Sequence, residues 1–299
     1  MNPKNAGAHI IENEFLRIGI SSKGAELISL YDLKNSRELL WQGDEAIWPG
    51  QAPILFPLVG RLKTKGYVYK GKRYDINIHG FARQMEFTLN EKSKEVVSFT
   101  LVSSEETRRQ YPFDFEFTVR YSLEERHLLK EHIVTNKSVE DMYYEVGGHD
   151  GYQLPLAGGE KMEEYYLSFE GKNALHSYMC NDEVMLLDKK RRIDLDKGRL
   201  NLKMSVFSND ALILDSDAGK AVELAGPKTG RLLTVRFPDF EYLGIWTKYM
   251  PFDTNYICIE PWSSLPDFLH LGAELTEKIG IRRLSAGQTE VLSYSVDVD

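Results

Sequence analysis

The feature that most constrains the fold is a long series of short segments in which apolar and polar residues alternate, without sustained helical periodicity. Alternation with a period of two is typical of half-buried β-strands. The segments are rich in valine, isoleucine, tyrosine and phenylalanine, and glycine, proline, asparagine and aspartate separate them. They are 16–20, 85–89, 96–102, 113–121, 128–135, 165–169, 211–214, 221–224, 232–237, 243–246 and 256–259. The pattern predicts an all-β protein, built as an antiparallel sandwich or barrel.

Two local signals add detail to this prediction. Residues 67–69 and 73–76 are rich in β-formers and flank Lys70-Gly71-Lys72, which predicts a hairpin. Residues 104–110 begin with a serine and carry two glutamates in the first turn, which predicts a short helix. No linker-like tract divides the chain, so we expect a single domain over residues 1–299.

The net charge of the 299-residue chain is −8. Nucleic-acid-binding proteins usually present a basic patch, so an acidic chain predicts neither a nucleic-acid partner nor an anionic membrane. The one basic run, 189–192, is predicted to be a solvated loop. The first residues lack the apolar core of a signal peptide, and no run of about 18 apolar residues occurs. We therefore expect a protein of the cytoplasm.

The sequence contains no pattern that would bring in a metal or a cofactor. Cys180 and Cys258 are the only cysteines, too few for a disulfide framework or a structural zinc site. A Walker loop, a dinucleotide-binding glycine pattern, a zinc-protease helix and a nucleophile elbow are all missing. We expect metal-free chemistry without a cofactor. His79 and His149 are far apart in sequence, and a metal would need them to meet in the fold.

Three segments interrupt the strand pattern with polar residues beside glycine and proline. They are 53–61 followed by 79–83, then 147–156, and then 258–267. In this order and spacing they resemble the aldose 1-epimerase (galactose mutarotase) family, and most closely its LacX-like branch. The resemblance extends from the first strands to Gly287. It implies a β-supersandwich with an open cleft on one sheet face, and interconversion of the α and β anomers of a sugar without a cofactor.

The ring opening of an aldose explains why such residues are needed. A base takes the proton of the anomeric hydroxyl, and an acid protonates the ring oxygen. The resemblance assigns the base to Glu260, which we expect at the end of the strand 256–259, among apolar neighbours that raise its basicity. It assigns the acid to His149, a residue type that titrates near neutral pH unaided. Asp150 and Gln153 stand where the family commonly has proline and asparagine. Two interpretations of Asp150 stay open, that it tunes the histidine or that it only reshapes the loop, and the departure bears on substrate preference more than on the reaction.

The resemblance also assigns residues that hold the sugar. His79 matches a histidine that hydrogen-bonds near the ring oxygen. Arg61 matches an arginine that holds sugar hydroxyls, for which a planar fork of donors is suited. Asp210 matches an aspartate that accepts hydrogen bonds from sugar hydroxyls, and Asp215 and Asp217 compete with it for this role.

Aromatic rings can stack on the apolar face of a pyranose, although aromatic residues of β-sandwiches more often lie in the core. Trp262, Trp246, Phe81 and Tyr152 are the candidates. We predict this role only for Trp262, because it follows Glu260 closely in sequence.

The sequence leaves three alternative functions open. Arg83 matches an arginine of mutarotases that act on phosphorylated hexoses, but residues 49–53 lack the second arginine of that group, and Lys63 or Lys65 would have to replace it. We therefore expect a neutral aldose as substrate, with Arg83 structural or bound to a carboxylate. A sugar sensor without catalysis would not need an acid–base pair. A glycosidase would need a second carboxylate beside Glu260.

Overall fold

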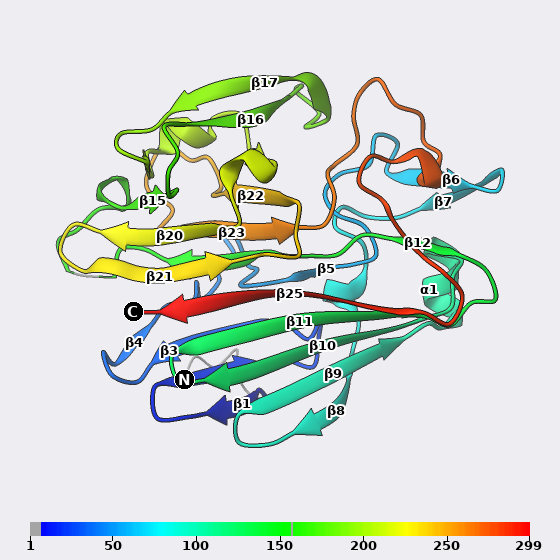
Figure 1. The fold of residues 1–299 in the computed structure, drawn as a ribbon, viewed down its shortest axis with the longest axis horizontal. Coiled ribbons are helices and arrows are strands. Elements are labelled where there is room, and N and C mark those ends of the chain that lie inside the picture. The colour runs from blue at the N-terminus through cyan, green and yellow to red at the C-terminus, as the bar shows by residue number, and fades with distance from the viewer. Residues whose placement is uncertain (1–6, 157) are drawn as a thin grey trace.

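The structure, a computed structural model, describes residues 7–156 and 158–299. Two large antiparallel sheets dominate it (Figure 1), which confirms the all-β prediction. The nine-stranded sheet has the order β18 (Arg199–Asn201), β15 (Tyr166–Ser168), β20 (Ala221–Gly226), β21 (Gly230–Arg236), β25 (Thr289–Val298), β11 (His127–Asn136), β10 (Phe115–Glu124), β9 (Val96–Val102), β8 (Thr88–Lys92). The eight-stranded sheet has the order β17 (Leu186–Asp194), β16 (Ala174–Cys180), β19 (Leu212–Leu214), β22 (Tyr242–Trp246), β23 (Tyr256–Trp262), β13 (Gly147–Gly148), β5 (Ile54–Leu55), and β14 (Asp150–Gln153) also pairs with β23.

Smaller elements complete the described part of the chain. A four-stranded sheet contains β1 (His9–Glu12), β2 (Leu16–Ile20), β3 (Leu27–Asp32) and β4 (Arg37–Glu38). The two-stranded pairs are β6 (Gly66–Tyr69) with β7 (Lys72–Asp75), and β12 (Met142–Tyr144) with β24 (Arg282–Leu284). The helices are α1 (Glu105–Gln110) and the 3₁₀ turns η2 (Ala82–Gln84), η3 (Met162–Glu164), η4 (Met204–Phe207), η5 (Ser216–Ala218) and η6 (Leu275–Glu277). In the ranges that the structure describes, no helix is long and apolar enough to cross a membrane.

Several local predictions are confirmed. Strand β9 has the predicted bounds, and β6 and β7 form the predicted hairpin. Lys70 and Gly71 both have positive φ (50° and 75°), as a two-residue turn between the strands of a hairpin requires. The predicted helix is α1, where the Ser104 side chain accepts a hydrogen bond from the Thr107 backbone N–H and Thr107 Oγ1 accepts one from the Ser104 N–H. This reciprocal cap satisfies backbone donors that a helix start leaves free.

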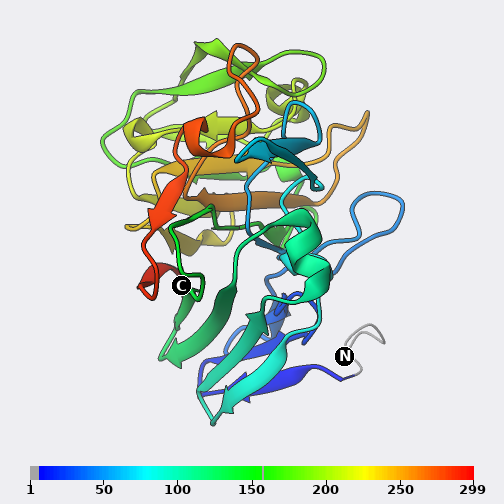
Figure 2. The ribbon, with the colours of Figure 1, turned by 90° about the vertical axis from the view of Figure 1, so that its right-hand side faces the viewer.

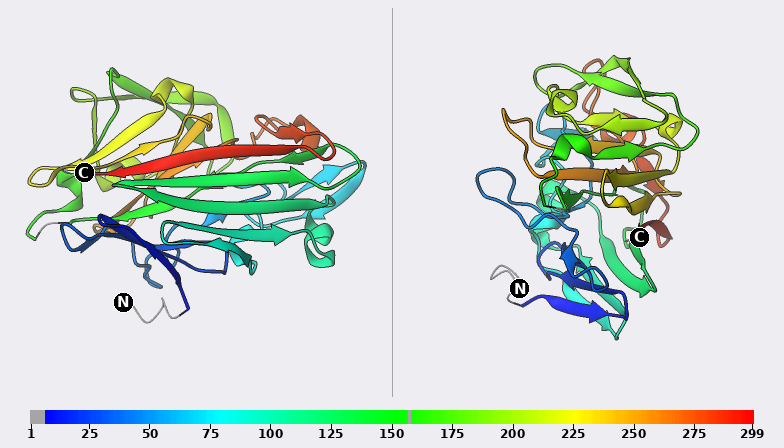
Figure 3. Two further views of the ribbon diagram at one scale, coloured as in Figure 1. Left: turned by 60° about the horizontal axis from the view of Figure 1, so that its bottom comes forward. Right: turned by 90° about the vertical axis from the view of Figure 1, so that its left-hand side faces the viewer.

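The hydrophobic core lies on the inward face of the long strands. Along β10 and β11 every second residue is buried, so each strand presents one apolar face to the interior. Figure 3 (left) shows β9, β10, β11 and β25 running side by side. The main cluster of buried side chains includes residues from Ile11 to Val298. Phe56, from the first polar segment, stacks on Phe117 of β10 with ring centroids 4.3 Å apart, which anchors that segment to the core.

The prediction of a loop at 189–192 is wrong, because these residues lie in β17 at the edge of the eight-stranded sheet. Lysine and arginine are uncommon in central strands, but an edge strand tolerates them, and their charge discourages pairing with another chain. Lys190 pairs with Asp215, and its Nζ lies 4.4 Å from the centre of the Tyr178 ring. The basic run is therefore a charged strand edge.

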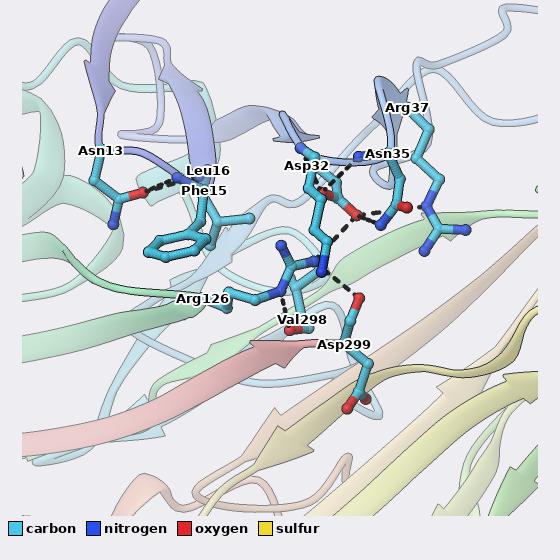
Figure 4. Close-up of polar contacts among 10 residues, drawn as sticks. Asn13, Phe15, Leu16, Asp32, Asn35, Arg37, Arg126, Val298 and Asp299 are labelled. Carbon is cyan, nitrogen blue, oxygen red and sulfur yellow. Dashed lines mark hydrogen bonds and ion pairs between the residues drawn. The ribbon is translucent and has the colours of Figure 1, made fainter.

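A buried carboxylate connects the four-stranded sheet to the end of the chain (Figure 4). This sheet lies at the end of the molecule away from β16 and β17 (Figure 2). Asp32 is fully buried and accepts hydrogen bonds from the Asn35 side chain (2.6 Å) and from Arg126 (3.1 Å). Arg126 also donates to the backbone oxygens of Val298 and Asp299, each at 2.8 Å. Burial opposes ionisation of Asp32, but the hydrogen bonds from Asn35 and Arg126 hold its pKa below the usual value.

His132 on β11 gives a pH prediction for stability. Its ring is fully buried between Phe117 and Tyr294, and burial lowers its pKa to about 3, with Lys130 acting in the same direction. Below the unfolded-state pKa of about 6.5 the unfolded chain therefore binds a proton that the folded chain does not, so this residue makes stability fall as pH falls. We expect His132→Phe to gain about 2–3 kcal/mol of unfolding free energy relative to the wild type between pH 7 and pH 4.5.

Urea unfolding of both proteins at several pH values measures this difference. His176→Phe is the matched control, because His176 is only half-buried on β16. A difference between wild type and His132→Phe that stayed constant from pH 7 to pH 4.5 would contradict the prediction.

Candidate active site

A cleft on the eight-stranded sheet brings together all seven residues predicted to form the site. The cavity has a volume of about 240 Å³. Its lining includes the predicted residues Arg61, His79, Arg83, His149, Asp210, Glu260 and Trp262. They come from segments that lie far apart in the sequence, so the fold places them together as the resemblance implied. Their roles in binding and catalysis stay predictions.

Glu260 lies within β23 and not at a strand end, which corrects the sequence analysis. The strand was predicted over residues 256–259, yet β23 continues to Trp262, although proline cannot donate a ladder hydrogen bond. Alternation along the strand places Cys258, Glu260 and Trp262 on one face. On the neighbouring strand Gly244 lies opposite Glu260, and a Cβ there would come 2.7 Å from the Trp262 ring. The glycine thus leaves room for Trp262 beside the carboxylate.

His149 is the cross-strand neighbour of Glu260. Gly147 pairs with Trp262 and Asp150 pairs with Ile259, so the register places His149 opposite Glu260. The His149 Nε2 atom lies 3.3 Å from Glu260 Oε2. Side chains opposite each other in an antiparallel pair share a face of the sheet. The acid and base candidates are therefore held side by side by strand pairing.

The surroundings of this pair favour the neutral form of both groups. Burial lowers the pKa of His149 to about 3. Burial also raises the pKa of Glu260 well above its usual value, and the negative charges of Asp210 and Asp150 act in the same direction. The Trp262 indole N–H acts in the opposite direction and lowers this pKa. Shifts of this kind are common at catalytic sites, where proton affinities are adjusted by the environment.

His79 is held in one orientation by the first polar segment. The Gly60 backbone N–H donates to His79 Nδ1 (3.1 Å), and the His79 backbone N–H donates to the Gly60 oxygen (3.0 Å). Because Nδ1 accepts, the neutral ring carries its proton on Nε2. The rings of His79 and His149 are 5.5 Å apart, so the two motif histidines do meet in the fold. Gly80 has a φ of 72°, and a Cβ there would lie 2.2 Å from the Phe56 oxygen, so only glycine fits this turn.

The charged lining residues differ in how they are held. Among the described residues Arg61 forms no side-chain ion pair or hydrogen bond, so its guanidinium is available to a ligand. Arg83 donates to the Ile78 backbone oxygen (3.0 Å), and burial lowers its pKa while the nearby Glu26 carboxylate acts against this. Asp210 lines the cleft, whereas its competitor Asp215 pairs with Lys190. The structure thus favours Asp210 as the aspartate of the site.

Trp48 is a lining residue that the sequence analysis missed. Its ring stacks on His149 with centroids 5.1 Å apart, and it also contacts Trp246, at 5.6 Å. A Cβ at Gly50 would lie 2.8 Å from the Trp48 ring, and one at Gly151 would lie 2.7 Å from it, so both glycines make room for the indole. The sequence signal was the tryptophan directly before Pro49-Gly50.

The other aromatic candidates divide between the cleft and the core. Trp262 and Trp246 line the cleft. Phe81 and Tyr152 belong to the main core cluster and are not part of the cleft lining. Only the two tryptophans of this set can therefore contact a ligand.

Asp150, the departure from the common family pattern, faces away from His149. It is fully buried and accepts a hydrogen bond from the fully buried Lys130 of β11 (2.7 Å). The Tyr294 hydroxyl donates to the same carboxylate oxygen (3.0 Å). A Cβ at Gly148 would lie 2.1 Å from that hydroxyl, so glycine is required next to this pair. Asp150 thus ties the strand that carries His149 to the nine-stranded sheet.

Glu145 supports the site from behind, and no sequence signal identified it. The Val59 N–H donates to Oε2 (2.7 Å), and the Ser264 hydroxyl donates to Oε1 (2.6 Å). Lys278 Nζ lies 2.9 Å from Oε1, and burial raises the pKa of Glu145. One carboxylate therefore holds the first and third polar segments in place.

The fold also assembles potential metal ligands that the sequence spacing did not show. Within the described ranges, one ligand atom each from His149, Cys258 and Glu260 lie within 4.8 Å of one another. All three residues are buried.

Comparison with known proteins identifies the family of this chain. The family model for aldose 1-epimerase matches residues 8–282. The plasmid-encoded protein LacX of Lactococcus lactis subsp. lactis is 35% identical, over 96% of this chain and 98% of LacX. A galactose mutarotase-related enzyme from Lactobacillus acidophilus has a TM-score of 0.90 at 35% identity, covering 98% of this chain and 97% of its own. A galactose mutarotase-like protein from Lactobacillus casei has a TM-score of 0.90 at 30% identity, covering 98% and 100%. The chain belongs to the aldose 1-epimerase family.

Proposed function

We propose that this protein is a mutarotase that interconverts the α and β anomers of a neutral aldose, with Glu260 as base and His149 as acid. The observation that carries the proposal is the cross-strand pair itself, with His149 Nε2 3.3 Å from Glu260 Oε2 at the cleft. A base and an acid at this separation can reach the two oxygens on the anomeric carbon of one sugar. A binding protein without catalysis has no need of such a pair.

The reaction needs two proton transfers in each direction. Glu260 takes the proton of the anomeric hydroxyl while His149 gives a proton to the ring oxygen, and the bond between that oxygen and the anomeric carbon breaks. The aldehyde then rotates about its bond to the next carbon. Ring closure on the other face returns both protons to their original holders. Ring opening converts a carboxylate and an imidazolium into two neutral groups, which the buried environment favours.

Two features of the cleft stabilise the protonated, positively charged form of His149. The Trp48 ring stacks on His149, and an aromatic face attracts a cation, so it stabilises the imidazolium. The carboxylate of Glu260 stabilises the same cation from the side. Both contacts oppose the effect of burial on the protonated form of His149.

The remaining lining residues would orient the sugar. His79 carries a donor on Nε2, which suits the ring oxygen. Asp210 would accept hydrogen bonds from sugar hydroxyls, and Arg61 would donate to them. Trp262 and Trp246 offer apolar surfaces for the pyranose face.

Anomer exchange measured by NMR across a panel of plain and phosphorylated sugars tests the proposal. We expect at least one neutral aldose to exchange far faster with the protein than without it. If no sugar of the panel did so, the proposed activity would be excluded for that panel.

A mutarotase for phosphorylated hexoses is the second candidate. It is favoured by one observation, that Arg61 and Arg83 both line the cleft and, among the described residues, neither has an ion-pair partner within 4.0 Å. Two convergent cations are what a phosphate group needs. Against it, Arg83 already donates to Ile78, and Lys63 donates to the backbone oxygens of Leu269 and Leu271 and is not part of the cleft lining.

The two candidates differ in kcat/KM for a hexose and its 6-phosphate. We expect the neutral hexose to be preferred, and Arg83→Ala to change the two values by a similar factor, with the exposed Arg73→Ala as control. A preference for the 6-phosphate of about tenfold, equivalent to 1.4 kcal/mol, that Arg83→Ala removed would replace the neutral aldose by the phosphorylated one.

A further inference from the structure

Cys258 is a buried thiol that the proposed reaction does not use. It lies on β23 two residues before Glu260, on the same face of the sheet, and it is fully buried. Its sulfur belongs to the group of ligand atoms from His149, Cys258 and Glu260 that lie within 4.8 Å of one another. Its cross-strand neighbours are Gly151 and Trp246, and it packs in an apolar cluster with Trp48 and Trp246, both of which line the cleft.

These three ligand types suit one class of cation. An imidazole nitrogen, a thiolate and a carboxylate are the donors that Zn²⁺ and similar soft divalent ions prefer, and three protein ligands leave a fourth position open. Donor atoms around a tetrahedral Zn²⁺ lie about 3.3–3.8 Å apart. His149 Nε2 and Glu260 Oε2 are already 3.3 Å apart, so only Cys258 needs to move closer.

Charge balance favours the same cation. A divalent ion displaces the protons of the Cys258 thiol and the Glu260 carboxyl group to solvent, and the resulting thiolate and carboxylate together neutralise its two positive charges. Glu260 Oε2 is buried and, apart from its ion-pair contact with His149, has no hydrogen-bond partner, so the ion would also satisfy this acceptor.

We propose that His149, Cys258 and Glu260 form a binding site for a soft divalent cation such as Zn²⁺, and that the bound ion inhibits the enzyme. The ion reaches the site through the cleft, which both His149 and Glu260 line. The inhibition rests on the proposed function, because the ion would occupy the lone pairs of His149 and Glu260 to which protons bind during the reaction. The binding itself does not depend on that function.

Three proteins test the inference: the wild type, Cys258→Ala, and Cys180→Ala as the matched control at the other cysteine, on β16. Exhaustive chelation should leave the turnover of all three unchanged. Added Zn²⁺ should then inhibit the wild type and Cys180→Ala, and a chelator should restore them. Cys258→Ala should keep its basal turnover and require at least about tenfold more Zn²⁺ for the same inhibition, since it loses one of three protein ligands.

A spectroscopic titration separates the site from the activity. Cd²⁺ bound to a thiolate gives an ultraviolet charge-transfer band, which should appear at one equivalent in the wild type and Cys180→Ala and be absent from Cys258→Ala. Equal inhibition of Cys258→Ala and wild type, or no band in the wild type, would overturn the site. A chelated wild type that lost turnover and regained it with Zn²⁺ would overturn the inhibition and the metal-free mechanism. A wild type with the band but without any mutarotation would support the site and exclude the proposed function.

Discussion

We expect Glu260→Gln to lower mutarotase turnover by about 10²- to 10⁴-fold, the usual contribution of a positioned acid or base. Glutamine keeps the shape of the side chain but cannot take the proton of the anomeric hydroxyl. The fold should not suffer, because Glu260 is buried with a raised pKa and a neutral amide fits such surroundings at least as well as a carboxylate. Loss of turnover with retained or increased stability is therefore the expected pair of results.

Turnover by NMR exchange and stability by urea unfolding measure the two effects separately. Glu241→Gln is the control, because Glu241 is an exposed glutamate that pairs only with Lys220 in the described structure. His149→Asn should lower turnover by a similar factor, since it removes the acid of the same pair. Near-full turnover in Glu260→Gln would show that the base lies elsewhere.

The second large effect concerns the ion pair behind the site. We expect Lys130→Met to cost about 3–5 kcal/mol of unfolding free energy, because it leaves the carboxylate of Asp150 buried without its cation. Asp150→Asn should cost a comparable amount, since it leaves the Lys130 ammonium without a counter-charge. The double variant should recover much of the loss, because the amide introduced by Asp150→Asn would still accept a hydrogen bond from Tyr294 and no buried charge would remain at this pair.

Urea unfolding of the wild type, both single variants and the double variant forms a double-mutant cycle that isolates the pairwise free energy. The exposed pair of Lys70 and Glu140 is the matched control, and its disruption should cost less than about 1 kcal/mol. Additive losses in the Lys130 and Asp150 cycle would mean that the two charges do not stabilise each other.

The ion pair of Lys130 and Asp150 gives a physical reason for the departure from the common family pattern. The sequence shows an aspartate after His149 where proline is common, and by itself this left open whether Asp150 tunes the histidine or reshapes the loop. The structure shows that Asp150 points to the opposite side of the strand and binds Lys130. Its negative charge still raises the pKa of Glu260 from behind. The departure thus concerns the support and electrostatics of the pair, and the cleft lining does not contain Asp150.

The sequence by itself predicted most of the long strands, and its resemblance to a known family supplied the residues expected at the site. Period-two alternation predicted the strands because each strand buries one face, and the turn and cap residues placed the β6–β7 hairpin and helix α1. It could not predict that β23 continues past Pro261 or that the basic run 189–192 is an edge strand, because neighbouring strands decide both. It also gave no sign of Glu145, whose burial follows from contacts with segments far away in the chain.

Only the tertiary structure decided which side chains meet. Strand register set His149 opposite Glu260, and Trp48 reached His149 from a loop about a hundred residues earlier. The same register brought Cys258 to the pair, although the sequence shows no metal-ligand spacing. Local patterns report which face of a strand is buried, whereas a site needs side chains from several strands at fixed distances. Those distances come from sheet pairing and close packing, which no single segment of the sequence contains.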